Sequence, residues 1–318
     1  MRGPASSVVV AMADGRVPEM PEAIVDFRVK LPTRTSREEP QPPVPEEYLH
    51  YDEVYDGFLE NLECTVEDWR EEAERTGIGP SVMQAEVEWA DPHELNDRLA
   101  AVVRDNPDRV ACGFGCVDPR NVMDAVREVD RAILELGLRG IVFEPGFLGI
   151  SPTDRCCYPV YARCAQLGVP VGLHTGINFS SHGPLEHERP VLIDRIACDF
   201  PQLVLICHHG GWPWPHEAAA VAWKHRNVYL EFGAIAPRYM APGAGGGWGD
   251  IAHLMDTVLR EQVLFGADWP MLRYERALEE IDGLGLRPES RAAYLGGNAR
   301  RLLERVEAGL EETPEAAL

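Results

Sequence analysis

The sequence predicts a (βα)8 TIM barrel, a fold of the α/β class. Eight short apolar runs alternate with segments of helical periodicity, and a polar side chain follows nearly every run. Strands that alternate with helices form a parallel sheet, and eight such units close a barrel. The 318 residues fit one barrel of about 250 residues with added loops and termini.

The candidate strands are short runs rich in Val, Ile and Leu. In chain order they are residues 24–29, 82–87, 110–116, 140–143, 171–174, 203–207, 228–232 and 263–265. The first run, AIVDFRVKL, alternates apolar and polar side chains and ends on two cations, Arg28 and Lys30. Because successive side chains of a strand point to opposite faces, these two cations point the same way.

The segments between the runs carry an apolar stripe at helical spacing. In residues 121–137, Val122, Ala125, Val129 and Ile133 form one stripe, and Gly137 closes the segment. Similar stripes occur in YPVYARCAQLG and PVLIDRIACDF. Helical connections of this length can return each strand parallel to the one before it.

The termini and two insertions depart from this rhythm. The predicted divisions are an N-terminal extension at 1–22, a single barrel domain at 23–307 and an acidic tail at 308–318. The patch VVVAMA is too short for a secretory signal and is soon broken by Asp14. Residues 33–57 are rich in Pro and acid, and residues 236–250 contain a Gly cluster; both are candidate lids or plain surface loops.

Composition excludes several classes of partner. The net charge of −22 repels nucleic acid and anionic lipid, and no apolar run reaches the roughly 18 residues that span a bilayer. Eight Cys without a C-x-x-C pair suit reduced thiols in a cytoplasm. We therefore expect a cytoplasmic protein that acts on a small molecule, and an anionic substrate would need local cations such as Arg28 and Lys30.

Catalytic groups of a TIM barrel lie at the carboxyl ends of its strands. The polar residues at these ends are Arg28, Lys30, Glu86, Glu88, Asp118, Glu144, His174, His209, Glu231 and Asp268. Any one such His suits a structural hydrogen bond to a carbonyl. His174, His209 and Asp268 each follow an apolar strand directly, and together they indicate an active site.

Several segments resemble the amidohydrolase-related (amidohydrolase 2) branch of the metal-dependent hydrolase superfamily. They are RVACGFGCVDPRN, LRGIVFEP, YPVYARCAQLGVPVGLHTG, FPQLVLICHHGGWPW, NVYLEFG, VLFGADWP and GGNARRLL. This branch contains aminocarboxymuconate semialdehyde decarboxylase and the resorcylate and vanillate-type decarboxylases. The resemblance runs from about residue 23 to residue 303 and implies an amidohydrolase-like barrel, a lyase or hydrolase activity and a homodimer.

Members of that branch carry a D-x-H-x-H motif at the end of strand one, where both His bind the catalytic metal. Here the aligned segment is DFRVKL, so Asp26 is kept while Arg28 and Lys30 stand in place of the two His. The motif becomes D-x-R-x-K, and the resemblance implies a degenerate metal site.

The other family positions match this sequence. By resemblance, His174 corresponds to the strand-five metal ligand, and His209 to the strand-six His that activates water or protonates substrate. Asp268 corresponds to the strand-eight Asp. The neighbouring His208 is the less favoured equivalent of the strand-six His.

The two cations change the chemistry expected at this site. Arg cannot ligate a metal, Lys does so only after losing its proton, and both charges oppose a nearby divalent ion. In the first interpretation no metal is bound: Arg28 pairs with a substrate carboxylate or with Asp268, and Lys30 holds a charge or acts as a base or nucleophile. His209 is then the acid or base, and Asp268 orients either Lys30 or His209.

In the second interpretation a metal such as zinc moves to Glu144, His174 and His209, because three ligands and a water form an ordinary catalytic zinc site. Glu144 can instead pair with Arg28 or Lys30. Trp212 and Trp269 follow two of the functional strand ends and can line a substrate pocket or pack beneath the loops.

The sequence therefore predicts an enzyme, a decarboxylase-like lyase or hydrolase, that acts without a metal on a small carboxylated or carbonyl-bearing substrate, cyclic or aromatic. One alternative is a metal-dependent enzyme with the shifted site. Another is a catalytically inactive relative that binds a small acid or a partner protein.

Overall fold

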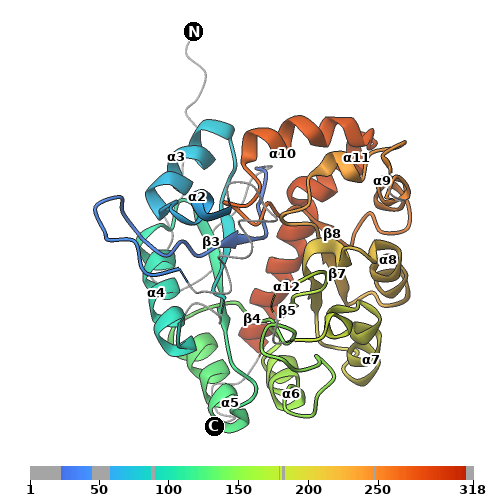
Figure 1. Cartoon of the computed structure of the whole chain (residues 1–318). Coiled ribbons are helices and arrows are strands. Elements are labelled where there is room, and N and C mark those ends of the chain that lie inside the picture. Colours follow the sequence, from blue (N-terminus) through green and yellow to red (C-terminus); the bar gives the residue numbers. More distant parts are fainter. Residues whose placement is uncertain are drawn as a thin grey trace.

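Eight parallel strands lie in one sheet in the order in which they occur in the chain (Figure 1). This computed structural model describes residues 23–44, 58–86, 90–178, 180, 183–245 and 248–312. The strands are β1 (Val29–Lys30), β2 (Ser81–Gln84), β3 (Val110–Cys116), β4 (Gly140–Phe143), β5 (Val171–Leu173), β6 (Leu205–Cys207), β7 (Val228–Glu231) and β8 (Val263–Leu264). The predicted barrel is confirmed.

Backbone hydrogen bonds from the first strand close the barrel. Phe27 N donates to Phe265 O at 2.8 Å, and Lys30 N donates to Trp269 O at 3.0 Å. On the other side, Val29 pairs with Met83 of β2. The segment around β1 therefore lies between β2 and the end of β8, which brings Arg28 into the ring of strand ends.

All eight predicted strands are present, but regular pairing is shorter than expected at the first. The prediction began at residue 24, whereas β1 covers Val29–Lys30. Val25 N donates to Leu295 O, and Arg28 N donates to the Asp26 carboxylate. These backbone amides therefore do not take part in regular pairing with a neighbouring strand. Val87, the last residue of the second predicted strand, lies outside the described residues.

Helices surround the strands (Figure 1). They are α2 (Phe58–Leu62), α3 (Val66–Thr76), α4 (Pro92–Asp105), α5 (Val122–Asp130), α6 (Tyr158–Leu167), α7 (Val191–Asp199), α8 (Pro215–Lys224), α9 (Asp250–Asp256), α10 (Tyr274–Ile281), α11 (Pro288–Ala292) and α12 (Asn298–Glu312). The predicted stripe is confirmed in α5, which continues as a π-helical turn, Arg131–Glu135. Ala125, Val129 and Ile133 are buried, and Gly137 follows in the left-handed conformation.

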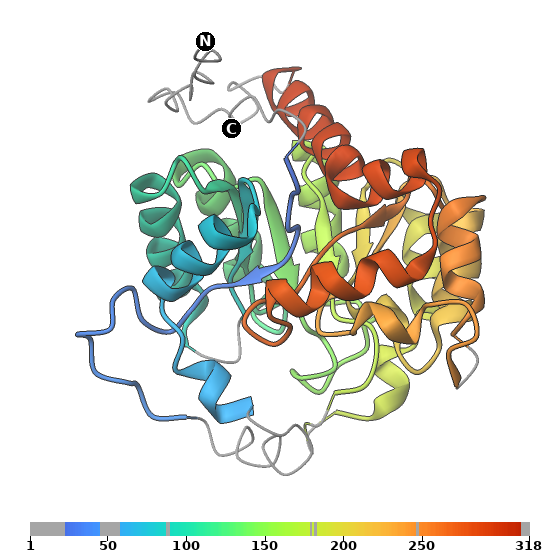
Figure 2. The ribbon, with the colours of Figure 1, turned by 90° about the horizontal axis from the view of Figure 1, so that it is seen from above.

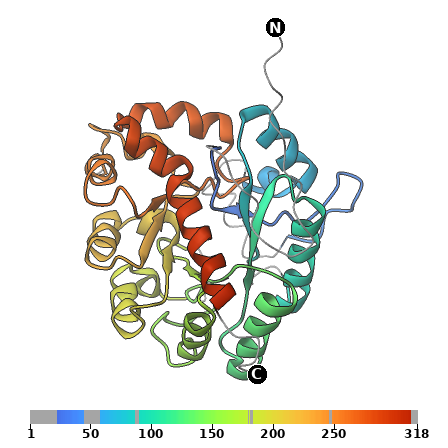
Figure 3. The same ribbon diagram turned by 180° about the vertical axis from the view of Figure 1, so that it is seen from behind.

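The C-terminal helix α12 crosses the amino-terminal end of the barrel (Figure 3). Glu307 pairs with Arg139, which precedes β4, and Gly309 packs on Gly168 at the end of α6. The predicted acidic tail at 308–318 therefore starts inside a helix, which continues to Glu312 and packs its partly buried Leu310 against the core.

The two predicted insertions are described only in part. Residues 33–44 leave β1 and extend beside α3, where Arg34 bridges to Thr65, the N-cap of that helix (Figure 2). Residues 45–57 lie outside the described part, as do the predicted extension at 1–22 and residues 246–247 of the second insertion. In the described portion, no helix is long and apolar enough to cross a membrane.

Candidate active site

The carboxyl ends of the strands bring most of the predicted site residues together. Arg28 lies at the centre, buried to 2% exposure. Its Nε donates to Asp268 Oδ1 at 2.9 Å, and its Nη2 donates to Glu86 Oε1 at 3.2 Å. Nη2 also lies 3.7 Å from Glu144 Oε1, and Nη1 lies 3.8 Å from Glu231 Oε2. One guanidinium thus contacts carboxylates from the ends of four other strands.

Lys30 lies further out, at the mouth of the barrel. Its ammonium pairs with Glu86, and its side chain is 13% exposed. Leu31, Asn61 and Pro270 lie beside it and line a small pocket with it. Both predicted cations therefore have carboxylate partners from this chain, and for Arg28 these include Asp268 and Glu144, which the sequence offered as partners beside a substrate carboxylate.

The centre carries more acids than bases. Asp26, Glu86, Glu144, Glu231 and Asp268 surround two cations. Burial raises the pKa of Asp26 to about 7 and that of Glu231 to about 8, although Arg28 opposes the shift at Glu231. Burial lowers the pKa of Arg28, but the carboxylates around it more than compensate and raise it. Part of the acidic surplus is therefore neutralised by protons at neutral pH.

Asp26 joins the first strand to two other parts of the barrel. Its carboxylate accepts the backbone N–H groups of Arg28 and Ala267 at 2.9 and 3.0 Å, and the Tyr274 hydroxyl at 2.8 Å. Trp69 Nε1 of α3 donates to the same hydroxyl at 2.9 Å. Asp26 therefore fixes the backbone that carries Arg28 and does not contact the open mouth.

His174 is oriented by an acid that the sequence did not single out. Its Nδ1 lies 2.6 Å from Glu188 Oε2, and Glu188 Oε1 accepts Asn178 Nδ2 at 2.7 Å. Phe147 meets the imidazole edge-on, with ring centroids 5.0 Å apart. With Nδ1 held by a carboxylate, Nε2 is the nitrogen left for chemistry.

His209 follows β6 in a left-handed backbone conformation, with φ of 57°. Its Nδ1 donates to Gly233 O at 2.8 Å. Asp268 has a similar φ of 53° after β8. Since non-Gly residues rarely adopt this conformation, both side chains leave the strand direction at an unusual turn.

The two imidazoles predicted at the mouth lie against each other. The ring centroids of His174 and His209 are 4.6 Å apart. Burial, and then the charges of Arg28 and His174, lower the pKa of His209 well below its usual 6.5. A neutral His209, with Nδ1–H given to a carbonyl, presents the Nε2 lone pair and can accept a proton.

His208 lies beneath this pair and was the less favoured of the two adjacent His. Its Nδ1 is hydrogen bonded to Glu231 Oε2 at 3.0 Å, and its Nε2 has no hydrogen-bond partner within the described ranges. A Cβ on Gly172 of β5 would come 2.4 Å from that Nε2, so the glycine leaves room for the ring. Burial and Arg28 lower the pKa of His208 as well.

The remaining predicted residues lie apart from this cluster. Trp269 is buried and donates from Nε1 to Glu72 Oε2 of α3 at 3.0 Å. Trp212 is half-buried and packs near Trp248, with ring centroids 6.4 Å apart. Asp118 pairs with Arg120, and Glu88 lies outside the described residues.

The donor atoms at the barrel mouth do not fit a divalent ion as they stand. Asp268 is held by Arg28 Nε, and Arg28 and Lys30 supply no ligand. In the part of the chain that the structure describes, the ligand atoms of Glu144, His174 and His209 do not gather within 4.8 Å of one another. Glu144 instead contacts Arg28, as the sequence offered as an alternative.

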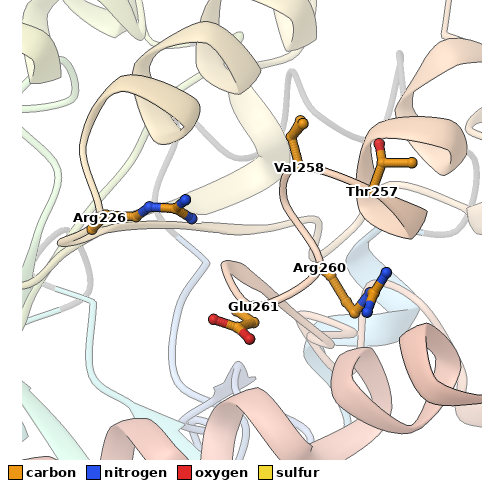
Figure 4. Close-up of a pocket in the computed structure, with 5 residues that line it drawn as sticks. All are labelled: Arg226, Thr257, Val258, Arg260 and Glu261. Atoms are coloured by element: carbon orange, nitrogen blue, oxygen red, sulfur yellow. The ribbon is translucent and has the colours of Figure 1, made fainter.

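A second pocket lies at the opposite end of the barrel. It has a volume of about 280 Å³ and lies just before β7 and β8 (Figure 4). Its lining residues are Arg226, Thr257, Val258, Arg260 and Glu261. Because parallel strands point their carboxyl ends the other way, this pocket is separate from the His174 and His209 cluster.

Two curated relatives share parts of this sequence. A 2-keto-4-carboxy-3-hexenedioate hydratase of Sphingobium sp. is 24% identical over 93% of this chain and 96% of its own length. A 2-amino-3-carboxymuconate-6-semialdehyde decarboxylase of Dictyostelium discoideum is 34% identical over 93 residues. That match spans 27% of this chain and 26% of that relative, so about three quarters of that protein has no counterpart in the match.

Two solved structures share the fold. A TIM-barrel protein from Bordetella bronchiseptica has a TM-score of 0.71 and 27% identity, covering 89% of this chain and 99% of its own. A 5-carboxyvanillate decarboxylase from Novosphingobium aromaticivorans, in complex with manganese and 4-hydroxy-3-methoxy-5-nitrobenzoic acid, has a TM-score of 0.66 and 15% identity. The latter covers 92% of this chain and 100% of its own.

The family model Amidohydrolase matches residues 25–305, which is most of the chain and includes every residue of the cluster described above. The hydratase and decarboxylase relatives agree with that match. The chain is therefore an enzyme of the amidohydrolase family.

Proposed function

We propose that the chain is a lyase of the hydratase or decarboxylase type, acting without a metal on a small substrate that carries carboxylate and carbonyl groups. The observation that carries the proposal is the pair of imidazoles at the mouth, with centroids 4.6 Å apart and near enough to the buried Arg28 guanidinium for its charge to lower the pKa of His209. This pair supplies a proton acceptor, and the guanidinium supplies the positive charge that a metal would otherwise provide.

His209 exchanges the proton in this proposal. Its pKa lies well below 6.5, so the imidazole is neutral at physiological pH and accepts a proton from water or from a substrate carbon. Once protonated beside His174, it returns the proton readily, because burial disfavours the cation. This sequence suits addition or removal of water, and it also suits replacement of a carboxylate by a proton.

Arg28 polarises an oxygen atom of the substrate in this proposal. Its Nη1 makes no hydrogen bond to any described residue and has its nearest carboxylate oxygen at 3.8 Å, the longest of its ion-pair contacts. Nη1 is therefore the guanidinium atom proposed to meet a substrate oxygen, while Nε and Nη2 stay with Asp268 and Glu86. Lys30 adds a second charge at the mouth.

A second candidate keeps a divalent metal. It is supported by the surplus of carboxylates over cations at the centre and by the manganese in the 5-carboxyvanillate decarboxylase complex. In that case a metal would displace Arg28 from Asp268. The substrates for which the relatives are named serve as test compounds for both candidates. They are 5-carboxyvanillate, 2-amino-3-carboxymuconate 6-semialdehyde and 2-keto-4-carboxy-3-hexenedioate.

The test measures turnover of these three compounds by the full chain, with chelator and with added manganese, and compares His209→Asn with the exposed control His253→Asn. We expect turnover of at least one compound in chelator, a loss of about 10²- to 10⁴-fold in kcat for His209→Asn, and wild-type rates for the control. The titration of His209 should lower the wild-type rate only well below pH 6.5.

Turnover that chelator abolishes and manganese restores would replace the first candidate by the second. Tight binding of a compound without turnover under either condition would identify the chain as an inactive relative. Equal activity of His209→Asn and wild type would remove His209 from the mechanism.

A further inference from the structure

Three potential metal ligands converge on the outer surface of the barrel. Asp194 and Cys198 lie one turn apart on α7, and His225 directly follows α8. Helices α7 and α8 pack side by side (Figure 1). Residues four apart on a helix share a face, so both α7 side chains point to the same place.

The ligand atoms are already close together. Asp194 Oδ1 lies 2.7 Å from His225 Nε2, and Cys198 Sγ lies 4.0 Å from that nitrogen. All three atoms lie within 4.8 Å of one another. Bonds of about 2.0–2.3 Å in a tetrahedral zinc site place neighbouring ligands about 3.3–3.8 Å apart, so side-chain adjustments of under about an ångström suffice.

A cation already occupies this cluster. Lys224 Nζ donates to Asp194 Oδ1 at 2.7 Å and lies 3.9 Å from Cys198 Sγ. The Lys224 side chain is 56% exposed, so its ammonium can leave for solvent without breaking any core contact. The surroundings thus accept positive charge at the position that a metal ion would take.

We propose that Asp194, Cys198 and His225 bind a divalent cation of the zinc class, with solvent as the fourth ligand. The donor set of one carboxylate, one thiolate and one imidazole is typical of zinc and disfavours magnesium and calcium. Binding releases the Cys198 thiol proton and displaces the Lys224 ammonium. The site lies on the helices outside the barrel and does not depend on the proposed function.

Cobalt titration tests this site in the full chain. A tetrahedral Co²⁺ thiolate absorbs in the near ultraviolet by sulfur-to-metal charge transfer, which carboxylate and imidazole ligands alone do not produce. We expect one equivalent of this band in the wild type, its displacement by zinc, and its loss in Cys198→Ser. The control Cys156→Ser, at a partly exposed thiol away from the cluster, should keep the band.

Lys224→Met separates a metal site from a surface hydrogen-bond network. Removing the competing ammonium while keeping the side-chain stem should tighten cobalt binding several-fold. The proposal is overturned if the wild type shows no charge-transfer band, if the band survives Cys198→Ser, or if Lys224→Met weakens binding.

Discussion

Arg28 is the cation around which the carboxylates of the barrel mouth are arranged. Its guanidinium contacts four carboxylates at distances from 2.9 to 3.8 Å. Burying a charge is costly unless partners surround it, and removing one partner of such a set leaves the others uncompensated. Arg28 therefore both holds the strand ends together and occupies Oδ1 of Asp268, the oxygen that the second candidate function would give to a metal.

Replacing Arg28 and Lys30 by the two His of the family motif should create a metal-binding site. In the double variant Arg28→His with Lys30→His, Asp268 is released and two ligands are added while two positive charges are lost. We expect manganese retained after gel filtration to rise from below about 0.1 equivalent toward one. Manganese avoids thiolates, so Cys198 does not interfere.

The control for this variant is Arg276→His on the exposed face of α10. Manganese content that is the same in the double variant and the control would contradict the role of Arg28 and Lys30 as substitutes for the metal.

Glu231 should make the stability of the fold depend on pH. Its pKa is about 8 in the folded chain against an ordinary 4.5, so the folded state holds this proton more tightly than the unfolded state does. The resulting stability is complete below about pH 4.5 and is lost as pH rises through about 8. Glu231→Gln stays neutral and should lack this loss, a difference of a few kcal/mol.

Urea unfolding from about pH 5 to about pH 9 measures this difference. Glu279→Gln on the exposed face of α10 is the control and should follow the wild type. Parallel pH dependence in Glu231→Gln and wild type would contradict the raised pKa.

Single residues show what the sequence could and could not predict about the site. His174, His209 and Asp268 were singled out because each ends an apolar run at a position where a barrel exposes its catalytic groups; in the structure the two imidazoles lie together and Asp268 contacts Arg28. Glu188 was not found, because it reaches His174 from a single short 3-10 turn, Leu185–Glu188, and no periodicity marks it. For Arg28 the sequence offered Asp268 and Glu144 as partners, whereas its contacts with Glu86 and Glu231 depend on the closure of the ring, which no local pattern contains.

Among the elements, β5 shows how a strand makes room for the site. Gly172 has no Cβ, and His208 Nε2 and Val142 fill the space that one would take. Gly172→Ala should therefore push the imidazole toward Glu231 and destabilise the fold by about 1–3 kcal/mol. The measurement is urea unfolding, with Gly283→Ala as control because nothing lies within 4 Å of the position of its missing Cβ.

Unfolding midpoints that match in Gly172→Ala, the control and the wild type would show that His208 moves without cost.

The helices were easier to predict from the sequence than the ends of the strands. The stripe in α5 is local, whereas the extent of β1 is set by carbonyls of Phe265 and Leu295 that lie far away in the sequence.

At the scale of the whole molecule, the negative net charge destabilises the folded state. With a net charge of −22, the excess carboxylates repel one another. Salt screens this repulsion, with a Debye length of about 10 Å at 0.1 M. The midpoint of thermal unfolding should therefore rise as sodium chloride increases from about 0.02 M to about 0.3 M. A falling midpoint would show that the surface ion pairs outweigh the general repulsion; sucrose at matched osmolality serves as the uncharged control.

The link between Arg28 and Asp268 joins residues that are 240 positions apart. A ribosome adds about 5–20 residues each second, so the first partner waits roughly 10 to 50 s for the second to be made. Until Asp268 has been made, the seam between the first and last strands cannot close, and Arg28 lacks this carboxylate partner. The Arg28 charge therefore reaches its final surroundings only after Asp268 has been made.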